Sequence, residues 1–320
     1  MSGSTQQLGR KISGAKDLGG VVRAMKALAA SSVGQYEKAV TALDEYLRTV
    51  ELGLAACLHA TAPTLLAANN ETRKEGAIGA IVFGSDQGLV GSFNEVIVDF
   101  SVKALRALPG KVTKIWAIGE RAESLLTEAA LSSVAGLEVP NSMDAITPLI
   151  GQILLEVQSA REMGKIGEVH VFHNRPKTGS AYEPTSRKLL PLDKAWQDKL
   201  SSTSWPSRTI PQLIEGVPLV LAAFVREYLF VVLFQACAES LASENASRLA
   251  SMQRAEKNID GMLDDLNRKF HRLRQASIDE ELFDVIAGFE ALTRNPSRGA
   301  SRSQHQAKAS QVEGPTRSDT

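Results

Sequence analysis

The chain has 320 residues, of which 43% are hydrophobic, so it is long enough for one large or two ordinary domains with a sizeable core. Lys and Arg together number 36, as do Asp and Glu, and the resulting zero net charge gives no global argument for a nucleic acid or a membrane surface as partner. Two widely separated cysteines, Cys57 and Cys237, and five scattered histidines predict neither a disulfide framework nor a metal site.

The N-terminal region, 1–62, is a predicted helix over about residues 5–58. Its apolar or small residues step by four and three, as in the seam of a coiled coil: Val33, Tyr36, Val40, Leu43, Leu47, Val50, Leu54 and Cys57. At 1.5 Å per residue this helix would be about 80 Å long. Gly19 and Gly20 stand inside it at a cost of about 1 kcal/mol each relative to alanine, so either two backbones approach closely there or the helix bends. The first residues lack the apolar core of a signal peptide, which makes the cytoplasm the expected compartment.

Strands and helices alternate between residues 76 and 200, which predicts a Rossmann-like α/β domain with a largely parallel sheet covered on both faces. The predicted strands are 76–83, 111–119, a stretch near 133–139 and 167–176; the predicted helices are 93–108, 120–131 and about 144–163; an extended stretch, 180–192, ends the domain. His170 and His173 would face opposite sides of the fourth strand, which argues against a metal pair.

A glycine-rich loop, SDQGLVGSFN (85–94), joins the first strand of this domain to the first helix. Its glycines lack the G-x-G-x-x-G spacing of a dinucleotide site, it has no lysine as a P-loop does, and Asp86 would put negative charge beside a phosphate. We therefore favour a tight turn, with Ser92 or Asn94 capping the helix, over a nucleotide site. No Ser/His/Asp, Cys/His or paired-carboxylate constellation stands out elsewhere, so we predict no catalytic site on this chain.

A second long helix is predicted within the region 209–293, because no proline interrupts it after Pro218. Its first part, 217–238, is apolar almost throughout. Arg226 and Glu227 in the middle of this segment would each cost about 2.5–3.5 kcal/mol in a bilayer. We therefore predict a buried helix of a soluble protein in place of a membrane span.

The rest of the second helix repeats the four-three spacing, with one step of five that changes the phase of the seam. The residues of this stripe are Ile259, Leu263, Leu266, Phe270, Leu273, Ile278, Leu282, Val285, Phe289 and Leu292. We predict that the stripes of the two long helices are buried against each other in an antiparallel coiled coil, with the α/β domain inserted between the arms. Residues 294–320 are rich in Ser, Arg and Gln and are typical of a disordered basic tail.

Three blocks in the same order resemble the gamma subunit of the rotary F-type ATP synthase, over about residues 5–293. The loop is similar to that family's S-D-R-G-L-C-G-G-x-N, with matching positions at Ser85, Asp86, Gly88, Gly91 and Asn94. VVRAMKALAAS (21–31) resembles its I-T-x-A-M-x-x-V-A-A-S. Residues 241–282 resemble its C-terminal helix, with A-S-E-x-x-A-R-M-x-A-M followed by R-Q-A-x-I-T-x-E.

The resemblance implies a rotor shaft. The two long helices would stand inside a ring of alternating alpha and beta subunits, with the α/β domain and the epsilon subunit at the foot, on the membrane rotor ring of c subunits. Ion flow would turn ring and shaft, and the uneven shaft would drive the beta-subunit sites through different nucleotide affinities. It also implies no cofactor on this chain, with ATP, ADP and Mg bound by partner subunits, no nucleic-acid partner, and a peripheral place at the cytoplasmic face of a bacterial inner membrane.

The resemblance also implies which residues contact the beta subunit: Met25, Arg23, Lys26, Arg274, Gln275 and Asp279. Arg274 and Gln275 match the family's R-Q, which contacts a beta-subunit loop in one rotary position. Asp279 stands where relatives usually have Thr, so a neutral hydrogen bond would become a charged one. Met25 matches the A-M at which the shaft meets beta. Without the family, each of these would be interpreted as a solvated or coil-facing helix residue.

Some positions depart from the family pattern. Gly19 and Gly20 replace polar residues and Val90 replaces a cysteine, which hints at an alternate bacterial form, and residues 294–320 extend beyond the relatives. One hypothesis is that this tail brakes rotation, and unchanged ATPase rate and coupling after its deletion would remove that idea. Two other classes stay open. They are a nucleotide-binding α/β protein and a generic coiled-coil scaffold that self-associates.

Overall fold

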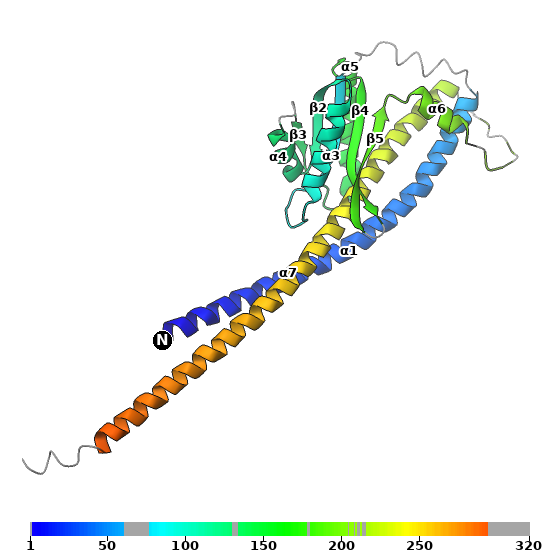
Figure 1. The fold of residues 1–320 in the computed structure, drawn as a ribbon. Coiled ribbons are helices and arrows are strands. Elements are labelled where there is room, and N and C mark those ends of the chain that lie inside the picture. Colours follow the sequence, from blue (N-terminus) through cyan, green and yellow to red (C-terminus); the bar gives the residue numbers. More distant parts are fainter. Residues whose placement is uncertain are drawn as a thin grey trace, which may run out of the picture. The chain divides into compact units, whose positions relative to one another are not determined.

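The computed structural model describes residues 2–60, 77–129, 134–177, 180–203, 205–207, 209, 212 and 216–293. In chain order a sheet domain stands between two long helices, as predicted, and Figure 1 shows it packed beside them. In chain order the elements are α1 (Ser2–Ala60), β1 (Ala77–Phe83), α3 (Phe93–Ala107), β2 (Lys111–Ile118), α4 (Glu120–Glu128), β3 (Val134–Leu137), α5 (Met143–Glu162), β4 (Glu168–Lys177), β5 (Ser180–Leu190), α6 (Lys194–Ser201) and α7 (Val217–Thr293). The predicted tail, 294–320, lies outside the described residues.

The sheet has the order β3-β2-β1-β4-β5, with β5 antiparallel to β4 and the other pairs parallel. This confirms the Rossmann-like domain with its largely parallel sheet. The central strand β1 is buried on both faces, which explains why its sequence is almost continuously apolar. Ile78, Ala80 and Val82 pack with α3 and α4, whereas Ile81 and Phe83 pack on the other side with α5, α1 and α7.

Helix α6 was not predicted, because eight residues are too few for a clear periodic pattern. Asp193 is its N-cap and accepts a hydrogen bond from the backbone N–H of Trp196 at 3.0 Å. The Trp196 indole then donates to the Tyr228 hydroxyl of α7 at 2.9 Å. A short helix thus attaches the end of the sheet domain to the long C-terminal helix.

The chain forms two compact units, Val21–Glu256 and, separately, Met1–Gly20 with Lys257–Thr320. Both long helices continue through this division without a break, including α1 at Gly19 and Gly20. In the larger unit the predicted seam of α1 is buried or half-buried, and Tyr36, Leu47, Val50, Leu54 and Cys57 belong to the same core as α7. The heptad pattern of α1 is therefore confirmed.

One position shows how closely α1 and α7 approach. A Cβ atom on Gly53 would lie 2.4 Å from Cε1 of Phe224, so this part of α1 has room for no side chain. Tyr46 donates to the Glu227 carboxylate at 2.9 Å, and Gln235 donates to Asp44 at 2.6 Å. Apolar packing and polar contacts across the seam therefore hold the two helices together.

The prediction that the stripe of the second helix is buried along its whole length is wrong beyond Phe270. Ile259 is 6% exposed, whereas seven large apolar side chains further on are exposed: Leu273 36%, Ile278 54%, Leu282 56%, Phe283 70%, Val285 69%, Ile286 46% and Phe289 68%. The reason is length. Residues 2–20 of α1 are too few to cover α7 from residue 257 to 293.

The apolar start of α7 is buried along one face only. Among the described residues, α7 is the one helix long and apolar enough to span a membrane, with a window of mean hydropathy 2.1 that is 28% buried. Leu221, Tyr228 and Val231 pack into the core, but Leu219 is 66% exposed. The predicted burial thus holds for the residues that face α1 and the sheet domain. The core helix of a soluble protein passes the same length and composition test.

Candidate functional site

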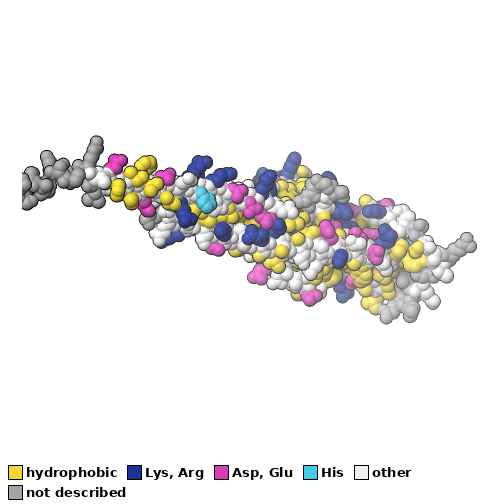
Figure 2. Space-filling view, turned by 90° about the horizontal axis from the view of Figure 1, so that it is seen from below, with side chains coloured by type: hydrophobic (Ala, Val, Ile, Leu, Met, Phe, Trp, Pro, Cys, Tyr) yellow, Lys and Arg dark blue, Asp and Glu magenta, His cyan; other side chains and the backbone are white. Residues whose placement is uncertain are grey.

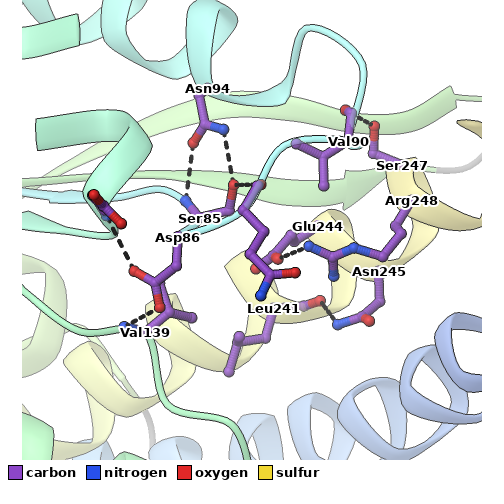
Figure 3. A network of polar contacts seen from close by, with 12 residues as sticks. Ser85, Asp86, Val90, Asn94, Val139, Leu241, Glu244, Asn245, Ser247 and Arg248 are labelled. Carbon is purple, nitrogen blue, oxygen red and sulfur yellow. Dashed lines mark hydrogen bonds and ion pairs between the residues drawn. The ribbon is translucent and has the colours of Figure 1, made fainter. Parts of the chain in front are cut away.

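The loop after β1 is closed by a buried pair of polar side chains (Figure 3). The backbone N–H of Ser85 donates to Oδ1 of Asn94 at 2.9 Å, and Nδ2 of Asn94 donates back to the Ser85 hydroxyl at 2.8 Å. The same hydroxyl donates to the carbonyl of Gln87 at 2.9 Å. Ser85 and Asn94 are 0% and 2% exposed, so these bonds satisfy groups that water does not reach.

The Asp86 carboxylate lies at the N-terminus of α4, a kind of position at which many proteins bind phosphate. Its two carboxylate oxygens accept from the backbone N–H groups of Glu120, the first residue of α4, and of Val139, each at 3.1 Å. A negative group at a helix N-terminus is stabilised by the helix dipole, which is how many proteins hold phosphate. Here the chain supplies that negative charge itself. These contacts favour the predicted structural turn over a phosphate cradle.

The capping prediction was half right. Ser92 is the N-cap residue of α3, but its side chain makes no capping hydrogen bond. Asn94 lies in the first turn and bonds Ser85 across the loop instead.

Glycines let the strand ends and the loop come together. A Cβ atom on Gly84 would lie 2.4 Å from Cβ of Ala122, and one on Gly119 would lie 2.7 Å from the backbone of Ser85. Gly91 has φ +61°, a conformation that side chains rarely adopt. Gly88 has no such neighbour, so its place in the family pattern has no packing reason in this structure.

The loop is fixed to α7 by serine side chains. Ser247 donates to the carbonyl of Val90 at 2.5 Å, and Ser243 donates to the carbonyl of Asn174 at 3.0 Å. Asn174 in turn donates to the carbonyl of Phe93 at 3.0 Å. Small polar residues in the run ESLASENAS (239–247) thus allow α7 to lie close to the ends of the strands. That run is the sequence signal for this contact.

A cavity of about 310 Å³ lies between α1, the loop and α7. Met25 and Asp86 line it together with Glu244 and Arg248, so the structure brings residues of all three family blocks together. Arg248 donates to the Glu244 carboxylate at 2.5 Å. Glu244 is 5% exposed, and burial raises the pKa of its carboxyl above the ordinary value, an effect that Arg248 opposes. The sequence did not single out Glu244 or Arg248.

The predicted beta-subunit contacts lie in both compact units. Arg23 is exposed on α1, Met25 is half-buried, and Lys26 forms an ion pair with Glu256 of α7 at 2.5 Å. Arg274, Gln275 and Asp279 are exposed on the part of α7 that belongs to the smaller unit. Their role in contacting a partner stays a prediction.

The described residues hold no group of three His, Cys, Asp or Glu side chains that could bind a metal ion. His173 is buried, and its Nε2 lies 2.7 Å from the Glu239 carboxylate. His170 contacts Glu168 at 3.1 Å instead, so the two histidines have separate partners.

The fold defines the class of protein. Two long helices pack against each other in the larger unit, and a Rossmann-like domain, inserted between them in the chain, is attached to the second helix. A family model described as ATP synthase matches residues 4–292. The chain therefore belongs to the ATP synthase family, among its gamma chains.

Individual relatives agree over nearly their whole length. The ATP synthase gamma chain of Polynucleobacter asymbioticus is 26% identical over 294 residues, covering 90% of this chain and 99% of the relative. That of Nitrosomonas europaea is 28% identical over 305 residues, with the same coverage of each chain. A chain of the Euglena gracilis mitochondrial ATP synthase, in its OSCP/F1/c-ring structure, superposes with a TM-score of 0.60 at 15% identity, over 93% of this chain and 97% of that chain. That likeness shows the fold.

Proposed function

We propose that this chain is the central rotor shaft of an F-type ATP synthase. In this role it couples ion flow through a membrane ring of c subunits to ATP synthesis or hydrolysis at beta-subunit sites. Family membership supports the proposal, as does the likeness to chains from the rotor of the Euglena enzyme. The chain itself performs no chemistry in this scheme, and ATP, ADP and Mg bind to the partner subunits.

The observation that carries the proposal is the uncovered apolar end of α7. Figure 2 shows hydrophobic side chains gathered along this end of the helix, and the seven large apolar residues from Leu273 to Phe289 are between 36% and 70% exposed. Burying one such side chain is worth about 1.5–3 kcal/mol, so leaving a whole row in water is unfavourable. A sleeve formed by the ring of alpha and beta subunits would cover this row.

Rotation would act by shifting populations. Each shaft angle presents a different side of α1 and α7 to a given beta subunit and favours one of its conformations. We assign these contacts to six side chains. Three are on α7, Arg274, Gln275 and Asp279, and three are on α1, Arg23, Met25 and Lys26. The first three are exposed, as a contact residue must be before assembly.

The α/β domain would receive the torque at the foot, beside the epsilon subunit and the c ring. The hydrogen bonds from Ser243 and Ser247 to the sheet domain, and from Trp196 to Tyr228, tie that domain to α7. A turning force on the domain would therefore pass into the helix. The chain would reach the membrane only through the rotor ring, at the cytoplasmic face.

Co-expression with the alpha and beta subunits of the same organism tests the proposal. Complex formation and ATPase activity are measured with and without this chain. We expect a stable complex whose multisite turnover requires the chain. A chain that stays apart and leaves turnover unchanged would contradict the rotor role, and self-association without the other subunits would favour the scaffold alternative.

A further inference from the structure

A second cavity, of about 370 Å³, lies in the larger unit between β4, β5, α6, α7 and Leu47 of α1. Three cationic side chains from three elements line it: Arg175 of β4, Arg187 of β5 and Lys199 of α6. Thr185 and Ser186 of β5 line it as well. The proposed function uses none of these groups.

Positive charge in this cavity exceeds negative charge. Glu239 is the one carboxylate among the described lining residues, and it is already engaged. It lies 2.7 Å from Nε2 of His173, 3.6 Å from Nε of Arg175, and accepts from Gln235 at 3.3 Å. Within the described part of the chain, Arg187 and Lys199 form no ion pair.

Arg187 is held in position although it lacks a carboxylate partner. It donates to the Tyr228 hydroxyl at 3.1 Å, and its guanidinium lies 5.8 Å from the centre of that ring. The Tyr228 hydroxyl engages one N–H of the Arg187 guanidinium, which has five N–H donors in all. His173, which is paired with Thr185 in the sheet and is 7% exposed, has a buried Nδ1 without a hydrogen-bond partner among the described residues.

We propose that this cavity binds the phosphate group of a small anion, with Arg175, Arg187 and Lys199 as its charged donors. A phosphate dianion offers charge and several acceptor oxygens, which match an arginine held in place and two further cations. The volume lies within the range of about 300–1,000 Å³ that is usual for small-molecule sites. It has room for free phosphate with water or for a phosphate carried on a small organic group. The negative charge of Asp86 argues against such a ligand in the loop; this cavity has the opposite charge.

Titration calorimetry of the full chain in a phosphate-free buffer tests the proposal, with inorganic phosphate in one arm and ADP in the other. We expect saturable phosphate binding that weakens by at least about tenfold in the double variant Arg175→Gln, Lys199→Gln. Both side chains are exposed, so this variant folds as the wild type does. ADP that competes with phosphate and loses affinity in the same variant assigns the phosphate to a nucleotide; phosphate binding without ADP binding assigns it to a smaller anion.

Two further variants make the test specific. Lys194→Gln removes a positive charge from the same helix, α6, but outside the cavity, and should leave affinity unchanged. Glu239→Gln removes the opposing charge and should tighten phosphate binding by about threefold or more. No saturation by phosphate or ADP up to about 10 mM, or equal losses in the double variant and Lys194→Gln, would overturn the proposal.

Discussion

At the scale of single residues, buried polar groups decide how the loop and the long helix meet. Ser85, Asn94 and Ser247 are each at most 6% exposed, and each has a partner from a different stretch of chain. A buried hydrogen bond is worth little net, but an unpaired buried donor or acceptor costs about 1–3 kcal/mol. These residues therefore stabilise one particular arrangement of the loop more than they stabilise the fold in general.

Replacing Asn94 by alanine should lower the free energy of unfolding by about 1–3 kcal/mol, because the buried backbone N–H of Ser85 loses its acceptor and the Ser85 hydroxyl loses one of its two hydrogen bonds. Urea unfolding of the purified chain measures the change. Asn141→Ala, at an exposed position, is the matched control and should stay within about 0.5 kcal/mol of the wild type. Equal losses in the two variants would show that the pair is not important for stability.

Glu244 should make stability depend on pH. Burial raises the pKa of its carboxyl above 4.5, so the folded chain binds this proton more tightly than the unfolded chain. The resulting stabilisation is complete at a pH below the ordinary pKa of the unfolded chain. It is lost as the pH rises through the raised pKa of the folded chain. Melting temperatures across this window should therefore fall less steeply with pH in Glu244→Gln than in the wild type. Identical slopes would contradict the assignment.

At the scale of elements, the contact between α1 and α7 combines a regular seam with one point of very close approach. The seam follows the four-three spacing, which is typical of a coiled coil. Gly53 departs from it, because the Phe224 ring fills the space that a side chain would need. The register of the two helices in the larger unit is therefore set by one glycine and one aromatic ring as well as by the heptads.

Two glycine-to-alanine substitutions in α1 should have opposite effects. Gly53→Ala places a methyl group against Phe224 and should destabilise the chain by about 1–3 kcal/mol. Gly34→Ala, in the same helix with no atom within 4 Å of the new Cβ, should stabilise it by about 0.5–1 kcal/mol. Thermal unfolding followed by circular dichroism compares them. A stabilised Gly53→Ala would show that the ring moves away without cost.

At the scale of the whole molecule, the C-terminal end of α7 carries a row of large apolar side chains that are exposed in the isolated chain. The large apolar side chains there have no cover from the described residues, and the same helix is well buried where it meets the sheet domain. Such an uneven distribution is expected of a chain that completes its packing in an assembly. The rotor proposal supplies the missing surface.

The double variant Phe283→Gln, Phe289→Gln should leave the isolated chain as stable as the wild type, since the two residues are 70% and 68% exposed. Its affinity for the alpha–beta ring should fall by at least about tenfold, because two apolar contacts are lost. Complex formation with the co-expressed subunits measures this. Glu290→Gln, a nearby exposed position, is the control, and equal assembly of both variants would mean that the apolar row does not contact the ring.

The local sequence pattern predicted most of the helices and strands, but not the contacts between residues that are far apart in the sequence. The heptads of α1, the strands β1, β2 and β4 and the unbroken α7 follow from periodicity, which is a property of neighbouring residues. Helix α6 was not predicted, because it is short. The pairing of Ser85 with Asn94 was not predicted, because it joins a strand end to a helix. The cationic cavity was not predicted either, since its residues come from five separate stretches of chain.

The sequence by itself determined that two long helices flank an α/β domain, that the loop is not a P-loop, and that the chain resembles ATP synthase gamma subunits. Only the tertiary structure decided that Asp86 fills the N-terminus of α4, that Glu244 is buried, and that the apolar stripe of α7 is left uncovered beyond Phe270. Periodicity shows which side of a helix is apolar, but the length of the opposing helix sets how much of that side is buried. Charge and burial at a site likewise depend on residues that are distant in sequence, and folding alone brings those residues together.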